Sequence, residues 1–126
     1  MTAIPARPSI RERAEALQRA QADFRRNRYQ IVEDPFSLYR DLAQLGLTTA
    51  ELRNAVLEAL KEITPRDYRG DYPPERAYEP AVKDAELFPF CWQSTSRKTL
   101  MYIKFCFHED QTCLVSFHRS RKVVGQ

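Results

Sequence analysis

The spacing of apolar residues divides the chain into a helical first half and a strand-forming last third. Between residues 9 and 30, apolar side chains recur three or four positions apart, which predicts an amphipathic helix with an arginine-rich opposite face. Residues 31–64 repeat this period in two shorter runs. Gly46 separates the two runs, and glycine is the residue type that commonly ends a helix. We therefore expect three helices before residue 65.

Two segments carry no such period. Residues 1–8 contain two prolines and predict a flexible tail. Residues 65–86 are rich in proline and tyrosine and predict a long ordered loop. Loops of this length in compact domains are often functional.

After residue 87 the apolar period changes to two, which is the period of a strand. The clearest run places Met101, Ile103 and Phe105 on one face and Tyr102 and Lys104 on the other. The predicted strands cover residues 88–92, 99–107 and 112–118, and a polar turn at residues 108–111 joins the last two.

The same alternation assigns the two faces of the last strand. One face carries Cys113, Val115 and Phe117. The other carries Leu114, Ser116 and His118. We expect the first face to join the core and the second to lie beside Tyr102 and Lys104.

Helices that precede strands predict an α+β fold, with the N-terminal helices packed on one face of a small C-terminal antiparallel sheet over residues 87–122. A chain of 126 residues suits one domain, which we expect to span residues 9–126. In that domain, residues 9–30 form a basic helical extension.

Composition excludes several classes of protein. Only 3 glycines argue against a glycine-rich nucleotide-binding loop, and the 3 cysteines show no C-x-x-C spacing, so we expect reduced thiols. No metal-ligand motif or cofactor motif is present, and we expect neither a metal nor a cofactor. No apolar run is long enough to span a membrane or to serve as a signal peptide, which predicts a cytoplasmic protein.

Charge is distributed unevenly. Residues 1–30 carry a net +4, residues 31–86 a net −5, and residues 87–126 a net +4. Both ends could therefore meet phosphates or an acidic partner. The acidic residues of the middle segment are scattered, and we interpret them as a solvated surface.

The second sheet face offers two interpretations. It carries Tyr102, Lys104, Ser116 and His118. These residue types fit an ordinary solvated face as well as they fit an RNA-binding face. Basic residues flank the strands at Arg97, Lys98, Arg119 and Arg121. Metal-free RNA cleavage needs a base, an acid and cations, and His118 is the side chain here best suited to a proton-transfer role near neutral pH.

Three segments, LGLTTAELRNAVLEALKEITPRDYRG, LMYIKFCF and LVSFHRSR, together resemble the MqsR-type mRNA interferases. These are toxins of bacterial toxin–antitoxin pairs and belong to the RelE-like superfamily. The resemblance covers about residues 42–122. It implies a RelE-like fold, metal-independent cleavage of mRNA, and a cognate antitoxin protein as partner.

Position by position, the resemblance assigns Tyr102 to an active-site tyrosine, and it places His118 and Arg69 where the family has lysines. A family glutamine falls at about Pro89, which cannot play the same part. Arginine keeps the charge of lysine but does not exchange protons near neutral pH, whereas histidine can act as an acid or a base.

The sequence thus predicts an mRNA endoribonuclease toxin of a type II toxin–antitoxin pair, with Tyr102, His118 and Arg69 as catalytic residues. Lys104, Arg97, Lys98, Arg119 and Arg121 are the predicted RNA-binding residues. The alternative is a non-catalytic module that keeps the toxin fold and binds RNA or protein. The altered glutamine position favours this alternative.

Overall fold

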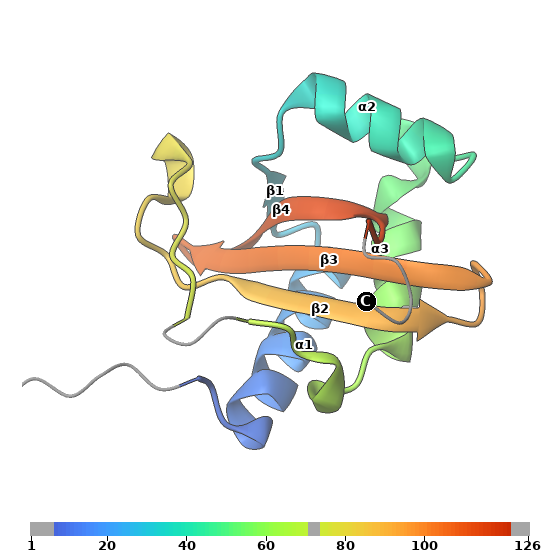
Figure 1. Ribbon diagram of the computed structural model, residues 1–126. Helices are drawn as coiled ribbons and strands as arrows, with labels where there is room; N and C mark the ends of the chain where they lie inside the picture. Colours follow the sequence, from blue (N-terminus) through green and yellow to red (C-terminus); the bar gives the residue numbers. More distant parts are fainter. Residues whose placement is uncertain (1–6, 71–73, 122–126) are drawn as a thin grey trace, which may run out of the picture.

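The computed structural model describes residues 7–70 and 74–121, and it has an α+β fold (Figure 1). The helices are α1 (Ile10–Arg25), α2 (Pro35–Gln44) and α3 (Leu52–Glu62), with the short 3-10 helices η1 (Thr49–Glu51), η2 (Pro65–Asp67) and η3 (Pro80–Val82). The strands are β1 (Tyr29–Ile31), β2 (Phe88–Ser94), β3 (Thr99–His108) and β4 (Gln111–Arg119). None of the described helices is long and apolar enough to cross a membrane.

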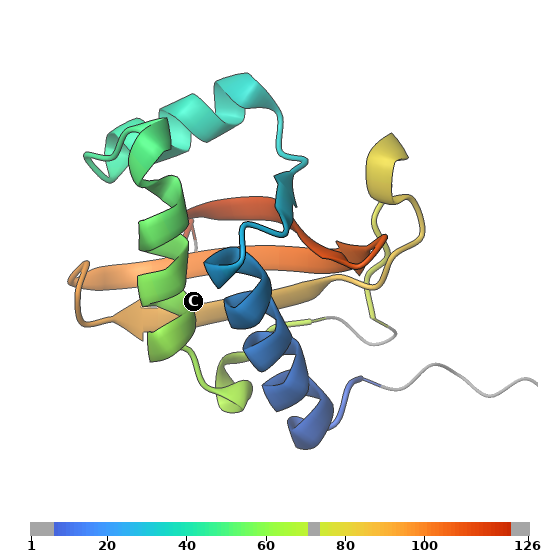
Figure 2. The same cartoon turned by 180° about the vertical axis from the view of Figure 1, so that it is seen from behind.

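Helices α1 and α3 lie side by side across one face of the sheet (Figure 2). The Ser9–Glu12 capping box opens α1 as predicted, and the helix buries Ala16, Leu17, Ala20 and Phe24 in the main core. The predicted basic extension is therefore a core-forming helix. Two of its arginines also pack on aromatic rings: the Arg13 guanidinium lies 4.5 Å from the Tyr68 ring centroid, and that of Arg19 lies 4.1 Å from the Phe107 ring centroid.

The tail predicted at residues 1–8 falls mostly outside the described residues. Pro8, at its end, is buried, and its carbonyl accepts a hydrogen bond of 2.9 Å from Arg13 Nε. This residue therefore packs with the domain.

The sheet has the strand order β1-β4-β3-β2, and β1 runs parallel to β4. The three C-terminal strands pair antiparallel as predicted, but the unpredicted parallel strand β1 makes the whole sheet mixed. β1 was not predicted, because three residues are too few to show a period. It is held in place by its backbone pairing with β4 and by the stacking of Tyr29 on Phe24, whose ring centroids are 4.2 Å apart.

The other three strands lie where the sequence predicts them. β2 is an edge strand, which suits Pro89 because proline cannot donate a ladder hydrogen bond. Glu109 and Asp110 both have positive φ angles and form the turn between β3 and β4. Met101, Ile103 and Phe105 face α1 and α3 in the main core, as the alternation predicts.

The face assignment of β4 is wrong over half of its length. Phe105 pairs with Leu114 and Lys104 with Ser116, which leaves Val115 as an extra residue in a β-bulge. The bulge brings Leu114 into the main core beside Phe117. Cys113 and Val115, predicted in the core, lie instead in a second apolar cluster.

The second cluster is formed where the predicted loop at residues 65–86 packs on the sheet. Ala77, Val82 and Leu87 are buried with Cys106, Cys113 and Val115, and so cover one end of the second sheet face. Both faces of β4 are therefore apolar near its start, so the alternation of its sequence does not identify the core face there. Residues 71–73 of the loop lie outside the described residues.

Glu62, at the end of α3, is an exception to the prediction that the acidic residues form a solvated surface. Its carboxylate accepts five hydrogen bonds from β2 and the β2–β3 turn: from Trp92 Nε1, Ser94 Oγ, the amide and hydroxyl of Thr95, and the amide of Ser96, at 2.7–3.0 Å. Burial alone would raise the pKa of Glu62, but these bonds lower it to about 2. The carboxylate thus fastens the helical layer to the sheet.

Candidate functional site

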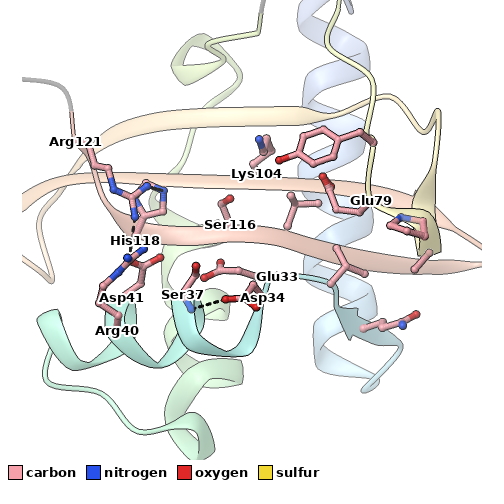
Figure 3. Close-up of a pocket in the computed structure, with 16 residues that line it drawn as sticks. Glu33, Asp34, Ser37, Arg40, Asp41, Glu79, Lys104, Ser116, His118 and Arg121 are labelled. Carbon is pink, nitrogen blue, oxygen red and sulfur yellow. Dashed lines mark hydrogen bonds and ion pairs between the residues drawn. The ribbon is translucent and has the colours of Figure 1, made fainter.

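Two cavities lie next to each other on the second face of the sheet, beyond the part covered by the loop. The Tyr102 cavity has a volume of about 420 Å³ and lies over β2 and β3. The α2 cavity has a volume of about 570 Å³ and lies between β4, the start of α2 and the loop around η3 (Figure 3). Lys104, Ser116, His118 and Arg121 line both cavities, and therefore form their boundary.

The structure brings five of the predicted site residues to one cavity. Arg69, Tyr102, Lys104, His118 and Arg121 all line the Tyr102 cavity. The register of β3 and β4 explains part of this, because Tyr102 lies directly opposite His118, and Lys104 directly opposite Ser116. Three basic side chains, a phenol and an imidazole thus share one depression.

Three predicted RNA-binding residues do not line either cavity. Arg97 lies 3.7 Å from Glu58 in an ion pair, and Lys98 is in the β2–β3 turn. Arg119 follows His118 in β4 and donates a hydrogen bond of 3.4 Å to the Gln44 carbonyl at the end of α2. The family glutamine position, Pro89, does line the Tyr102 cavity, but proline offers no side-chain hydrogen bond there.

His118 is buried, and the geometry around its ring favours one protonation state. Nδ1 lies 2.7 Å from the Arg119 carbonyl oxygen, which can only accept a hydrogen bond. Nε2 lies 3.0 Å from Nη1 of Arg121, which can only donate. The arrangement therefore fits a neutral imidazole that carries its proton on Nδ1.

The electrostatic environment also favours the neutral imidazole. Burial lowers the pKa of His118 below its ordinary 6.5, and the charges of Arg121 and Lys104 act in the same direction. The Arg119 carbonyl and Asp41 oppose them without reversing the shift. Tyr102 stacks on the imidazole, with ring centroids 5.1 Å apart and planes 20° apart, which fixes the orientation of both rings.

Two acidic residues at this site were missed by the sequence analysis. Asp41 of α2 is 2 % exposed and accepts a hydrogen bond of 3.1 Å from Nη2 of Arg121. Glu33, assigned to a solvated surface, has both carboxylate oxygens buried, close to Asp41. One signal was available for Asp41, since it shares the inward face of α2 with Leu38 and Leu42.

Glu33 should make the protein less stable at and above neutral pH than in mild acid, because its pKa is raised. Burial, followed by the nearby Asp41 carboxylate, raises the pKa of Glu33 from 4.5 to about 7. The protonated form is thus favoured on folding, and that contribution to stability is lost as the pH rises through the folded pKa. Because the side chain is half-buried, we expect Glu33→Gln to raise the free energy of unfolding by about 1–2 kcal/mol near pH ~8.

This gain should be close to zero near pH ~5, where the folded protein keeps Glu33 protonated. Urea denaturation at the two pH values measures the difference. Glu15→Gln, on the exposed side of α1, is the matched control and should show no such pH dependence. An equal effect of Glu33→Gln at both pH values would contradict the raised pKa.

The three cysteines are free thiols. Cys106 and Cys113 lie opposite each other on β3 and β4 and are fully buried. Burial raises the pKa of Cys106 to about 12, so this thiol is not reactive at neutral pH. Within residues 7–70 and 74–121, no group of three or more His, Cys, Asp or Glu side chains is arranged to hold a metal ion.

Comparison of the chain with protein-family models, with curated proteins and with solved structures found no match. The geometry of the two cavities and the residues that line them are therefore the basis for a functional assignment.

Proposed function

We propose that the protein is a metal-independent mRNA endoribonuclease with a RelE-like fold, and that it acts as the toxin of a type II toxin–antitoxin pair. The observation that carries this proposal is the gathering of Arg69, Tyr102, Lys104, His118 and Arg121 around one cavity. These side chains would supply the positive charge that stabilises the phosphate and the groups that transfer protons from the 2′-hydroxyl and to the 5′-oxygen.

The cations of the cavity suit the phosphate. Lys104 is 17 % exposed at its side chain and lies 4.0 Å from Glu75 in an ion pair. The Arg69 guanidinium donates to the carbonyls of Arg66 and Tyr68, which holds it beside the cavity. Together with Arg121, these residues would stabilise the additional negative charge of a pentacoordinate phosphorane.

The neutral state of His118 fits a general base. In the proposed reaction, Nε2 takes the proton of the 2′-hydroxyl while the 2′-oxygen forms a bond to phosphorus. The bond from phosphorus to the 5′-oxygen breaks, and the leaving oxygen receives a proton from Tyr102, either directly or through water. The products are a 2′,3′-cyclic phosphate and a 5′-hydroxyl, and no co-reactant is consumed.

One observation favours the alternative, a binding module that does not cleave RNA. The lone pair of Nε2 accepts a hydrogen bond from Arg121, and so it is occupied in this structure. A protein in which this contact never opened would bind RNA on the same face without cutting it.

An RNA cleavage assay separates these possibilities. The purified protein, with excess EDTA, should cut a mixed-sequence RNA and leave 2′,3′-cyclic phosphate ends. Tyr102→Phe should slow the reaction by about 10²- to 10⁴-fold, because it removes the proposed proton donor and keeps the ring that stacks on His118. Intact RNA with folded wild-type protein would refute the nuclease proposal.

The toxin assignment needs a separate test in a bacterial host. Induced expression should arrest growth and generate new RNA 5′ ends at a recurring short motif, and Tyr102→Phe should weaken both effects. Co-expression of a cognate antitoxin protein should restore growth. Normal growth with an active nuclease would contradict the toxin role alone.

A further inference from the structure

Arg121 is held at both ends of its guanidinium group. Nη2 donates to Asp41 Oδ1 at 3.1 Å, and Nη1 donates to His118 Nε2 at 3.0 Å (Figure 3). The side chain of Asp41 is 3 % exposed, whereas that of Arg121 is 62 % exposed. The buried Asp41 carboxylate on α2 thus holds the exposed side chain of Arg121, which lies just after the end of β4.

The charges around Asp41 favour this contact. A buried carboxylate needs a cationic partner, because desolvation makes an unpaired charge costly. Glu33 lies beside Asp41, and its raised pKa leaves Asp41 as the main negative charge of the two. Arg40 is a longer ion-pair partner of Asp41 at 3.7 Å, and Arg121 makes the shorter contact, so Arg121 is the main compensating charge for Asp41.

The contact has a consequence for His118. A guanidinium group can only donate hydrogen bonds, so its contact occupies the Nε2 lone pair. A general base needs that same lone pair for the incoming proton. Protonated Nε2 would in turn place two donors against each other and would expel Arg121.

We propose that Asp41 is a positioning residue that restrains Arg121 against His118 in the free protein, and that an RNA phosphate releases His118 Nε2 by drawing Arg121 away. This inference rests on the proposed binding of RNA and identifies how the RNA would regulate the same site. The phosphate competes well because Arg121 also lines the Tyr102 cavity with Arg69 and Lys104, where a bidentate arginine–phosphate contact can form.

The first test needs no RNA. Long-range ¹H–¹⁵N NMR spectra report the protonation and hydrogen bonding of both ring nitrogens of His118. Asp41→Asn and Arg121→Gln should each move the Nε2 resonance, and in the same direction, because each removes the donor from this nitrogen. Asp34→Asn is the matched control. It removes a carboxylate from the α2 cavity, which Asp41 also lines, and keeps a good helix N-cap, so it should leave the resonance unchanged.

The second test measures affinity for a mixed-sequence 2′-O-methyl RNA, which lacks the nucleophile and cannot be cleaved. Asp41→Asn should bind it about three- to tenfold more tightly than the wild type, because Arg121 no longer has to leave an ion pair. Asp34→Asn should change the affinity less than about twofold. In an Arg121→Gln background, Asp41→Asn should have no larger effect than Asp34→Asn.

These outcomes separate the inference from the proposed function. An unmoved Nε2 resonance in Asp41→Asn, weaker RNA binding by that variant, or an equal gain without Arg121 would each overturn the restraint, even if the protein cleaves RNA. If the resonance shifts and the affinity gain both appear but RNA stays intact, the restraint stands and the nuclease proposal fails. Arg121→Gln guards against misfolding of Asp41→Asn, because Arg121 is largely exposed.

Discussion

Replacement of His118 by glutamine is expected to slow RNA cleavage by about 10²- to 10⁴-fold, which is the usual contribution of a general base. Glutamine keeps a polar group at the position but cannot take up a proton. His108 provides the matched control, since it is the other histidine of the chain and lies at the exposed end of β3. His108→Gln should retain the wild-type rate.

The pH dependence of the wild-type reaction should also report His118 as the general base. Because the pKa of His118 is lowered, the base remains neutral to a pH below 6.5, and the acid limb of the rate profile should fall there. Single-turnover rates with a fluorescent RNA give both measurements. A His118→Gln variant that cleaves at the wild-type rate would remove His118 from the mechanism.

Replacement of Glu62 by alanine is expected to lower the free energy of unfolding by about 2–4 kcal/mol. The change leaves the Trp92 indole, two hydroxyls and two backbone amides without their common acceptor. Lys61→Ala, one position away on the exposed side of α3, is the control and should stay within about 0.5 kcal/mol of the wild type. Urea denaturation compares the three proteins.

Acid should remove this contribution. The folded pKa of Glu62 is about 2, below the ordinary 4.5, so its stabilisation is complete above pH 4.5 and is lost as the pH falls toward 2. The difference between wild type and Glu62→Gln should therefore shrink across this range. A constant difference would mean that the carboxylate is not the source of the stability.

The elements of the fold were predictable where local sequence determines them. The Ser9–Glu12 capping box, the stop at Gly46 and the alternation of β3 each reflect forces that act over a few residues, and all three predictions are confirmed. β1 and the bulge at Val115 depend on partners far away in the chain. Neither the parallel pairing of Tyr29 with Thr112 nor the burial of Cys113 under the loop leaves a local period.

The candidate site divides in the same way. Tyr102, Lys104 and His118 could be placed together from strand alternation, because the bulge at Val115 precedes His118 and leaves Ser116 and His118 on the predicted face. Asp41 and Glu33 could not be placed there, since their position depends on how α2 packs beside β4. The arginine–carboxylate contact of Asp41 was therefore invisible in the sequence.

The parallel pairing of β1 with β4 also has a consequence for folding kinetics. Tyr29 pairs with Thr112, so the chain between them must lose entropy before this pairing can stabilise the fold. Folding should therefore be slow for a chain of this size. β1 leads directly into α2, which carries Asp41, and β4 carries His118. The docking event that completes the sheet thus also places α2 beside β4, and a partly folded chain would not yet have the contact between Asp41 and Arg121.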